Sequence, residues 1–123
     1  MSIGVDIEDI KRFENKPQKF LDRVYTKGEQ EYCLSKSLPA KHFAVRFCAK
    51  EALIKALNSL NLPHPDLNQI EIYHNERNCP QIRLLNNSDN KLTFQLSLSH
   101  DRTKAIAFVQ VNKEAKRQRG KDA

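Results

Sequence analysis

The sequence predicts a single α+β domain, in which one N-terminal strand is followed by helices and then by a mostly antiparallel meander of strands. Three observations lead to this prediction. Apolar residues in the stretch 43–60 recur at alternating spacings of three and one, which marks one face of an α-helix. Residues 2–8 alternate in the period of a strand. The second half holds four short apolar runs separated by turn residues, which is typical of antiparallel strands.

The N-terminal strand has two chemically different faces. Carboxylates two residues apart on a strand project side by side, and hard cations such as Mg²⁺ prefer oxygen ligands of this kind. The alternative is an ordinary solvated strand face. One face consists of Ile3, Val5 and Ile7, which we expect to be buried, and the other consists of Gly4, Asp6 and Glu8.

Two shorter helices are expected before the central one. Pro17 makes one long helix unfavourable and predicts a helical segment over residues 17–25. Thr26 and Glu29 have the spacing of a capping box, which predicts a further helix toward Lys36. Pro39 is suited to the first turn of the central helix.

The central helix has a second apolar face that includes an acid. At about 100° per residue, Phe47 and Ile54 fall on the same side as Glu51. A carboxylate in that setting loses water unless a cation or a donor replaces it. Two interpretations stay open: an ion pair with Lys55 one turn later, or a metal ligand or general base in a cleft.

The four strands of the second half are predicted over residues 70–74, 81–85, 92–99 and 104–111. The last two are expected to form an antiparallel hairpin joined at residues 100–103. Ser99 and His100 lie at the end of the third of these strands, where hydroxyl, imidazole and turn N–H groups can form a phosphate site. The alternative is a turn-stabilising serine beside a surface histidine.

Composition is that of an ordinary globular protein, with 39% hydrophobic and 29% charged residues. The net charge of +6 divides into +3 over residues 1–60, zero over 61–112 and +3 over 113–123. We therefore expect one domain over residues 1–112 and a basic, disordered tail over 113–123. No apolar run approaches the length of a membrane span, and the acidic N-terminus is unlike a signal peptide, so we expect a cytoplasmic protein with no membrane partner. Cys33, Cys48 and Cys79 have no paired spacing and are expected to be free thiols.

Three motifs, GVDIEDIKRF at residues 4–13, RFCAKEALIKAL at 46–57 and SLSHD at 97–101, stand in an order that resembles the phosphopantetheinyl transferase family. The resemblance is closest to its short, single-lobe holo-acyl-carrier-protein synthase branch. It implies Mg²⁺-dependent transfer of 4′-phosphopantetheine from coenzyme A to a serine of an acidic apo acyl carrier protein, with release of 3′,5′-ADP. It also implies a role in fatty acid biosynthesis and a homotrimer with active sites between subunits.

The resemblance assigns roles to particular residues. It implies that Asp6 and Glu51 hold Mg²⁺, with Glu8 as a further ligand as in the two-lobed branch, and that Lys55 contacts the phosphates. Asp6, Glu51 and Lys55 would then be the catalytic residues. Coenzyme A contacts are implied at Arg46, Lys50, Lys55, Asn78, Pro80, Ser99 and His100, and carrier-protein docking is implied at Lys11, Arg12 and Arg23.

Two other functions remain as alternatives. The net positive charge is also compatible with a small nucleic-acid-binding protein, although the strands carry few basic or aromatic residues for a binding platform. A catalytically silent scaffold of the same fold is the second alternative.

Overall fold

The computed structural model describes residues 1–85 and 91–114, and the predicted α+β class is confirmed. The central helix begins at Pro39, as expected. Thr26 and Glu29 form the predicted capping box, because each side chain accepts a hydrogen bond from the backbone N–H of the other. The elements are β1 (Ser2–Asp9), the 3₁₀ helix η1 (Ile10–Phe13), α1 (Gln18–Val24), α2 (Lys27–Leu34), α3 (Pro39–Ser59), the 3₁₀ helix η2 (Leu67–Gln69), β2 (Ile70–His74), β3 (Pro80–Leu84), β4 (Leu92–His100) and β5 (Lys104–Lys113).

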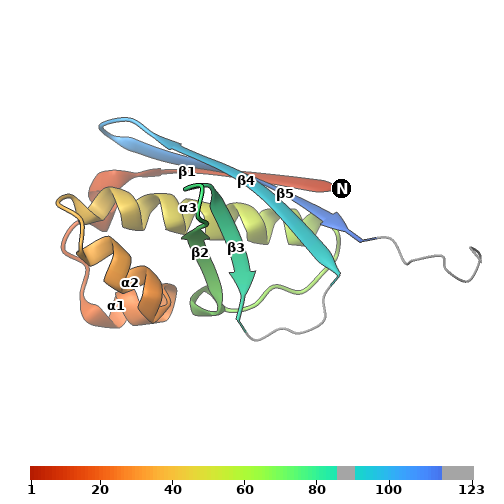
Figure 1. Ribbon diagram of the computed structural model, residues 1–123, viewed down its shortest axis with the longest axis horizontal. Helices are drawn as coiled ribbons and strands as arrows, with labels where there is room; N and C mark the ends of the chain where they lie inside the picture. Colours follow the sequence, from red (N-terminus) through yellow and green to blue (C-terminus); the bar gives the residue numbers. More distant parts are fainter. Residues whose placement is uncertain (86–90, 115–123) are drawn as a thin grey trace, which may run out of the picture.

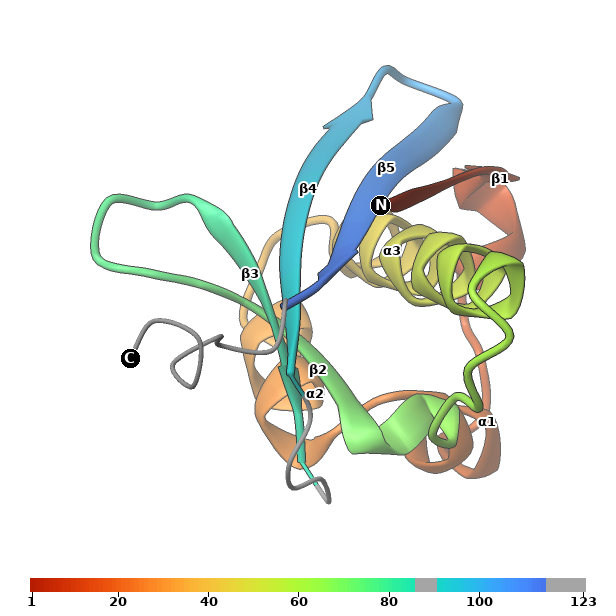
Figure 2. The same ribbon diagram turned by 90° about the vertical axis from the view of Figure 1, so that its right-hand side faces the viewer.

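The antiparallel strands are divided between two sheets. β5 lies between β1 and β4 in a three-stranded sheet, and β2 and β3 form a separate hairpin. α3 lies against one face of the larger sheet (Figure 1). In Figure 2 the tip of the β2–β3 hairpin lies beyond β4, at the edge of the larger sheet opposite to β1. Side chains of these two regions therefore belong to different sides of the molecule.

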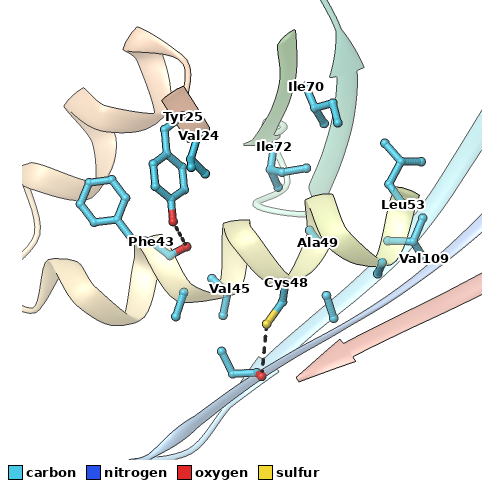
Figure 3. Close-up of a cluster of buried hydrophobic side chains, with 14 of the residues drawn as sticks. Val24, Tyr25, Phe43, Val45, Cys48, Ala49, Leu53, Ile70, Ile72 and Val109 are labelled. Carbon is cyan, nitrogen blue, oxygen red and sulfur yellow. Dashed lines mark hydrogen bonds between the residues drawn. The ribbon is translucent and has the colours of Figure 1, made fainter. Parts of the chain in front are cut away.

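The core is built around α3, whose apolar stripe contacts residues from both sheets (Figure 3). Two polar side chains within the core are hydrogen-bonded to backbone carbonyls. The hydroxyl of Tyr25 donates to the carbonyl of Phe43 at 2.9 Å, and the thiol of Cys48 lies 3.3 Å from the carbonyl of Ala105. These contacts fix α1, α3 and β5 relative to one another and make α3 a rigid support for side chains on its remaining face.

The prediction for the two faces of β1 is wrong in one respect: the face with Gly4 is buried and the apolar face is exposed. α3 approaches β1 so closely that a Cβ added to Gly4 would lie 2.0 Å from the carbonyl oxygen of Ala52. Only a residue without a side chain fits there. The face that also carries Asp6 and Glu8 is therefore turned toward α3, whereas the residues of the opposite face are largely exposed, with Ile3 at 54%, Val5 at 48% and Ile7 at 58%.

Three further sequence-based expectations concern the cysteines, membrane-spanning helices and the C-terminal tail. Cys33, Cys48 and Cys79 are free, as expected, and Cys33 and Cys48 are buried. None of the helices in residues 1–85 and 91–114 has the length and apolar character needed to cross a bilayer. The predicted disordered tail lies outside the described residues from 115 onward, and Lys113 is the last residue of β5. The domain boundary at residue 112 stays a prediction.

Candidate active site

The close packing of β1 on α3 brings Asp6 and Glu51 together, although they are far apart in the sequence. Both residues are partly buried. Burial raises the pKa of Glu51, and the negative charge of Asp6 raises it further, while Lys55 and His64 act in the opposite direction. Asp6 and Glu51 are two partly buried carboxylates that repel each other, and a bound cation would stabilise such a pair.

Lys55 belongs to the same site. Its ammonium group donates to the carbonyl of Val5 at 3.0 Å and to the Asp6 carboxylate at 3.3 Å. Of the two interpretations left open for Glu51, the ion pair with Lys55 is absent from the contacts of the described residues, because Lys55 pairs with Asp6 instead. Since the Lys55 side chain is 55% exposed, it can turn toward a ligand without leaving a buried charge behind.

The Asp6 carboxylate has one oxygen without a partner. Oδ2 is buried and accepts no hydrogen bond in the described structure, which is a costly arrangement unless a donor or cation completes it. Within residues 1–85 and 91–114, no group of three or more His, Cys, Asp or Glu side chains is arranged to hold a metal ion. Mg²⁺ is often bound by one or two carboxylates together with substrate phosphates and water. Asp6 and Glu51 fit that pattern.

Glu8 lies beside Asp6 on the same face of β1, but it is engaged elsewhere. Its carboxylate forms an ion pair with the guanidinium of Arg12. Burial and the neighbouring Asp6 raise the pKa of Glu8 to about 7, although Arg12 acts in the opposite direction. In this structure the Glu8 carboxylate is paired with Arg12 and not free for a metal ion. A role of Glu8 as a metal ligand stays a prediction.

Lys50 is predicted to contact coenzyme A, but its side chain is buried inside the protein. Its side chain has no exposed surface, and its ammonium group donates to the Glu29 carboxylate at 2.7 Å and to the carbonyls of Val24 at 2.7 Å and Leu67 at 2.9 Å. These three bonds use all its donors. Contact of Lys50 with coenzyme A stays a prediction that the structure does not support, because no donor and no surface of Lys50 remain for a ligand.

Arg46 lies on the same side of α3 as Lys50, in a cluster that the sequence did not suggest. It is 2% exposed, its guanidinium carbon lies 4.4 Å from the centre of the Tyr32 ring, and it donates to the carbonyl of His42. The Nε of Arg46 and the Nδ1 of His74 are buried without a partner. Nothing in the spacing of Tyr32, His42 and His74 along the sequence reveals this cluster, which depends on α2, α3 and β2 meeting.

Comparison with known proteins agrees with the motifs at this site. Residues 2–109 match the model of the 4′-phosphopantetheinyl transferase superfamily. The chain belongs to that superfamily. It is 38% identical over 111 residues to the holo-[acyl-carrier-protein] synthase of Thermodesulfovibrio yellowstonii, covering 87% of this chain and 94% of the relative. It is 39% identical over 116 residues to the corresponding protein of Chlorobaculum parvum, covering 90% and 97%.

Solved structures of such synthases share the fold. The Bacillus anthracis holo-(acyl-carrier-protein) synthase, in complex with CoA (3′,5′-ADP), matches with a TM-score of 0.75 and 28% identity over 93% of this chain and 96% of that chain. The Helicobacter pylori enzyme, in complex with coenzyme A, matches with a TM-score of 0.70 and 31% identity over 89% and 99%. The prediction that this chain is a phosphopantetheinyl transferase is confirmed.

The remaining ligand residues predicted for this phosphopantetheinyl transferase lie away from the acids. Ser99 and His100 are exposed at the end of β4, and His100 lines a pocket of about 890 Å³ between η1, the start of α3 and the β4–β5 turn. Asn78 and Pro80 lie at the tip of the β2–β3 hairpin, which projects beyond β4 and away from β1 (Figure 2). Asn78 has a φ of 63°, a left-handed conformation that asparagine tolerates.

The predicted docking residues of the phosphopantetheinyl transferase are all exposed. Lys11 and Arg12 lie in η1, and Arg23 lies in the last turn of α1. Among the three, Arg12 has an additional contact, because it is the ion-pair partner of Glu8. The docking segment and the acidic site are therefore joined by one ion pair.

Proposed function

We propose that this phosphopantetheinyl transferase moves 4′-phosphopantetheine from coenzyme A to a serine of an apo acyl carrier protein, with Mg²⁺ as cofactor and 3′,5′-ADP as the second product. The names of the curated relatives and the coenzyme A complexes of the solved neighbours support this proposal. The observation that carries it is the buried, unpartnered oxygen of Asp6 beside the carboxylate of Glu51.

Asp6 and Glu51 are the residues that would hold Mg²⁺, which when bound neutralises charge on the pyrophosphate of coenzyme A. Lys55 adds a mobile positive charge for the phosphate oxygens. Glu51 would also take the proton of the acceptor serine as the general base. The serine oxygen forms a new bond to the β-phosphorus while the bond from that phosphorus to 3′,5′-ADP breaks.

The position of the other ligand residues favours active sites shared between subunits. Asp6 and Glu51 lie where β1 packs on α3, whereas Asn78 and Pro80 belong to the β2–β3 hairpin, whose tip lies beyond β4, the opposite edge of the larger sheet (Figure 2). A coenzyme A molecule that contacts both sets on one chain would have to reach across the width of this sheet. Neighbouring copies of the chain bring the two sets together, which supports the predicted homotrimer.

The exposed face of the larger sheet supplies a surface for that assembly. Val5 is paired in register with Phe108 and Ile7 with Ile106, so these four apolar side chains lie together on the side of the sheet away from α3. Phe108 is 45% exposed. Apolar patches of this kind mark contacts between proteins. We assign this face to two further copies of the chain; sedimentation as a monomer would contradict the assignment.

Docking of the carrier protein is assigned to the basic residues of η1 and α1. Lys11, Arg12 and Arg23 are exposed, and Arg12 forms an ion pair with Glu8. An acidic carrier surface is electrostatically complementary to them. Action in the cytoplasm stays a prediction from the acidic N-terminal sequence.

The experiment that tests this function is mass spectrometry of an apo acyl carrier protein incubated with the protein, coenzyme A and Mg²⁺. We expect the carrier to gain the mass of one phosphopantetheine, and the gain to disappear when a chelator removes the metal. A carrier whose acceptor serine is replaced by alanine is the matched control and must gain nothing. Absence of transfer to several carriers by a folded, oligomeric sample would favour the catalytically silent scaffold.

A further inference from the structure

Two exposed leucines lie away from the sheet face that is assigned to further copies of the chain. Leu34, the last residue of α2, is 56% exposed, and Leu38, the N-cap residue of α3, is 63% exposed. Both line the pocket of about 890 Å³ that His100 also lines. This pocket lies where η1, the connection from α2 to α3 and the β4–β5 turn come together, on the left in Figure 1. Asp6 and Glu51 are not among the described residues that line it, so the metal-holding acids do not account for it.

The wall of this pocket is mainly apolar and runs from the core to the surface. Phe13 and Phe43 are each 3% exposed and Leu21 is 8% exposed, whereas the two leucines are more than half exposed. Covering such a wall with an apolar group is favourable, because apolar surface is removed from water on both sides. The volume leaves room for the apolar side chains of a partner.

Positive charge accompanies this apolar surface. Lys16, Lys41 and Arg102 line the pocket, and none of the three forms an ion pair within residues 1–85 and 91–114. Two acids, Glu14 and Asp101, line it as well. The Asp101 carboxylate accepts two backbone N–H groups of the β4–β5 turn at 2.8 Å, so its charge is partly used within the turn. The pocket therefore suits an apolar group that has carboxylates beside it.

The pocket is continuous with the predicted docking segment of the carrier protein. Ile10 and Phe13 of η1 line the pocket, and the exposed Lys11 and Arg12 lie between them in the same helix. A partner that binds these two cations is close enough to insert a side chain beside η1. Coenzyme A, with its several phosphate groups, gains little from a buried wall of apolar side chains, because phosphates need donors or cations.

We propose that this pocket receives an apolar side chain of the acidic carrier protein, while Lys16, Lys41 and Arg102 pair with carboxylates next to that side chain. This inference rests on the proposed function. An apolar anchor in a pocket supplies a large part of the affinity of many interfaces, and charges around it accelerate association and select the partner. Leu34 and Leu38 thus determine which carrier is accepted and take no part in the chemistry.

Leu38→Asp tests the pocket, because it replaces an apolar contact by a negative charge that repels an acidic carrier. Aspartate is a favourable N-cap residue, so the start of α3 is kept. We expect KM for the apo carrier to rise about 10-fold or more, the effect of losing one anchoring side chain. kcat at saturating carrier and KM for coenzyme A stay unchanged. In calorimetry, binding of a carrier whose acceptor serine is alanine weakens by the same factor.

Leu85→Asp is the matched control, because Leu85 is 46% exposed and does not line this pocket. It should leave carrier binding unchanged. Equal carrier affinity in Leu38→Asp and the unmodified protein overturns the inference. A rise in KM for coenzyme A in Leu38→Asp assigns the pocket to coenzyme A, and a changed oligomeric state in sedimentation assigns it to a second copy of the chain; either result also overturns the inference.

The proposed function and this inference fail in different ways. If the unmodified protein binds the carrier in calorimetry but transfers nothing, the proposed function is wrong, and comparison of the two variants still decides whether the pocket is the docking site. If transfer is normal and Leu38→Asp behaves like Leu85→Asp, only the inference is wrong. If the unmodified protein neither binds nor modifies any carrier, both are wrong.

Discussion

α3 carries a lysine on each of two faces, and each lysine meets a carboxylate from elsewhere in the chain. On the inner face, Lys50 and Glu29 form a buried ion pair at 2.7 Å, and Glu29 also accepts the backbone N–H of Ile72 at 2.7 Å. On the outer face, Lys55 and Asp6 form a looser pair at 3.3 Å. There, one oxygen of Asp6 has no partner.

The difference lies in how completely the charges are satisfied. Every donor of Lys50 is used inside the protein, and removing its charge would leave Glu29 buried and unpaired. The charges around Asp6 are incompletely paired and partly exposed, so they remain available to a ligand. The fully paired network of Lys50 and Glu29 stabilises the fold. The incompletely paired network of Lys55 and Asp6, although similar in composition, can bind a ligand. Substitutions on the inner face should therefore lower the stability of the fold. Substitutions on the outer face should lower the rate of transfer and leave the stability nearly unchanged.

The largest effect is expected for Lys50→Met, which removes one partner of the buried pair and leaves Glu29 without its cation. We expect the free energy of unfolding to fall by about 3–5 kcal/mol, measured by urea denaturation. Lys55→Met is the control on the same helix, and because its pair is exposed we expect a loss of only about 0–1 kcal/mol. Similar losses for both variants would contradict the distinction between the two faces.

The second prediction concerns the outer face. Glu51→Gln keeps the shape of the side chain but removes the base and the proposed metal ligand, so transfer to the carrier protein should slow by about 10²–10⁴-fold. Stability should stay within about 0.5 kcal/mol, because the repulsion between Glu51 and Asp6 is lost as well. Rates come from mass spectrometry of the carrier and stabilities from urea denaturation.

Glu31→Gln is the matched control for Glu51→Gln, since Glu31 is exposed on α2 and away from the acids. It should leave both the rate and the stability unchanged. Retention of the full transfer rate by Glu51→Gln would remove Glu51 from the mechanism. A large loss of stability in that variant would instead place Glu51 among the structural acids with Glu29.

The sequence predicted those elements whose signals are local. The apolar period of α3, the Thr26–Glu29 capping box and the alternation in β4 and β5 each lie within a few residues, and all are confirmed. The buried face of β1 could not be predicted from alternation, because the period of a strand does not say which face meets the helix. Contact of Gly4 with the backbone of Ala52 decides it.

The candidate site shows the same limit. Asp6 and Glu51 were recognised from motifs that lie in continuous stretches, and the structure brings them together. Lys50 belongs to the same motif as Glu51 but is buried, because its partner Glu29 comes from a helix far away in the sequence. A motif gives the residue types of a helix, whereas the neighbours that each face meets come from tertiary packing.

The smallest predicted effect concerns the protonation of His42, which lies among cations on the inner side of α3. Burial, together with the positive charges of Arg46, Lys41, Lys36 and His100, lowers the pKa of His42 to about 4. The unfolded chain therefore binds a proton at His42 more readily than the folded protein does between about pH 6.5 and pH 4. Over that range the stability contributed by neutral His42 is lost as the pH falls.

His42→Gln should remove this dependence. We expect the unmodified protein to lose on the order of 1 kcal/mol more than the variant between pH 7 and pH 4.5, since His42 is only partly buried and solvent screens its charge. Glu8 has a raised pKa and acts in the opposite direction, but it is present in both proteins and cancels in the difference. His64→Gln, at an exposed histidine, is the control. Equal pH dependence of all three proteins would mean that Arg46 and its neighbours do not hold His42 neutral, and the inner side of α3 would then tolerate a further charge.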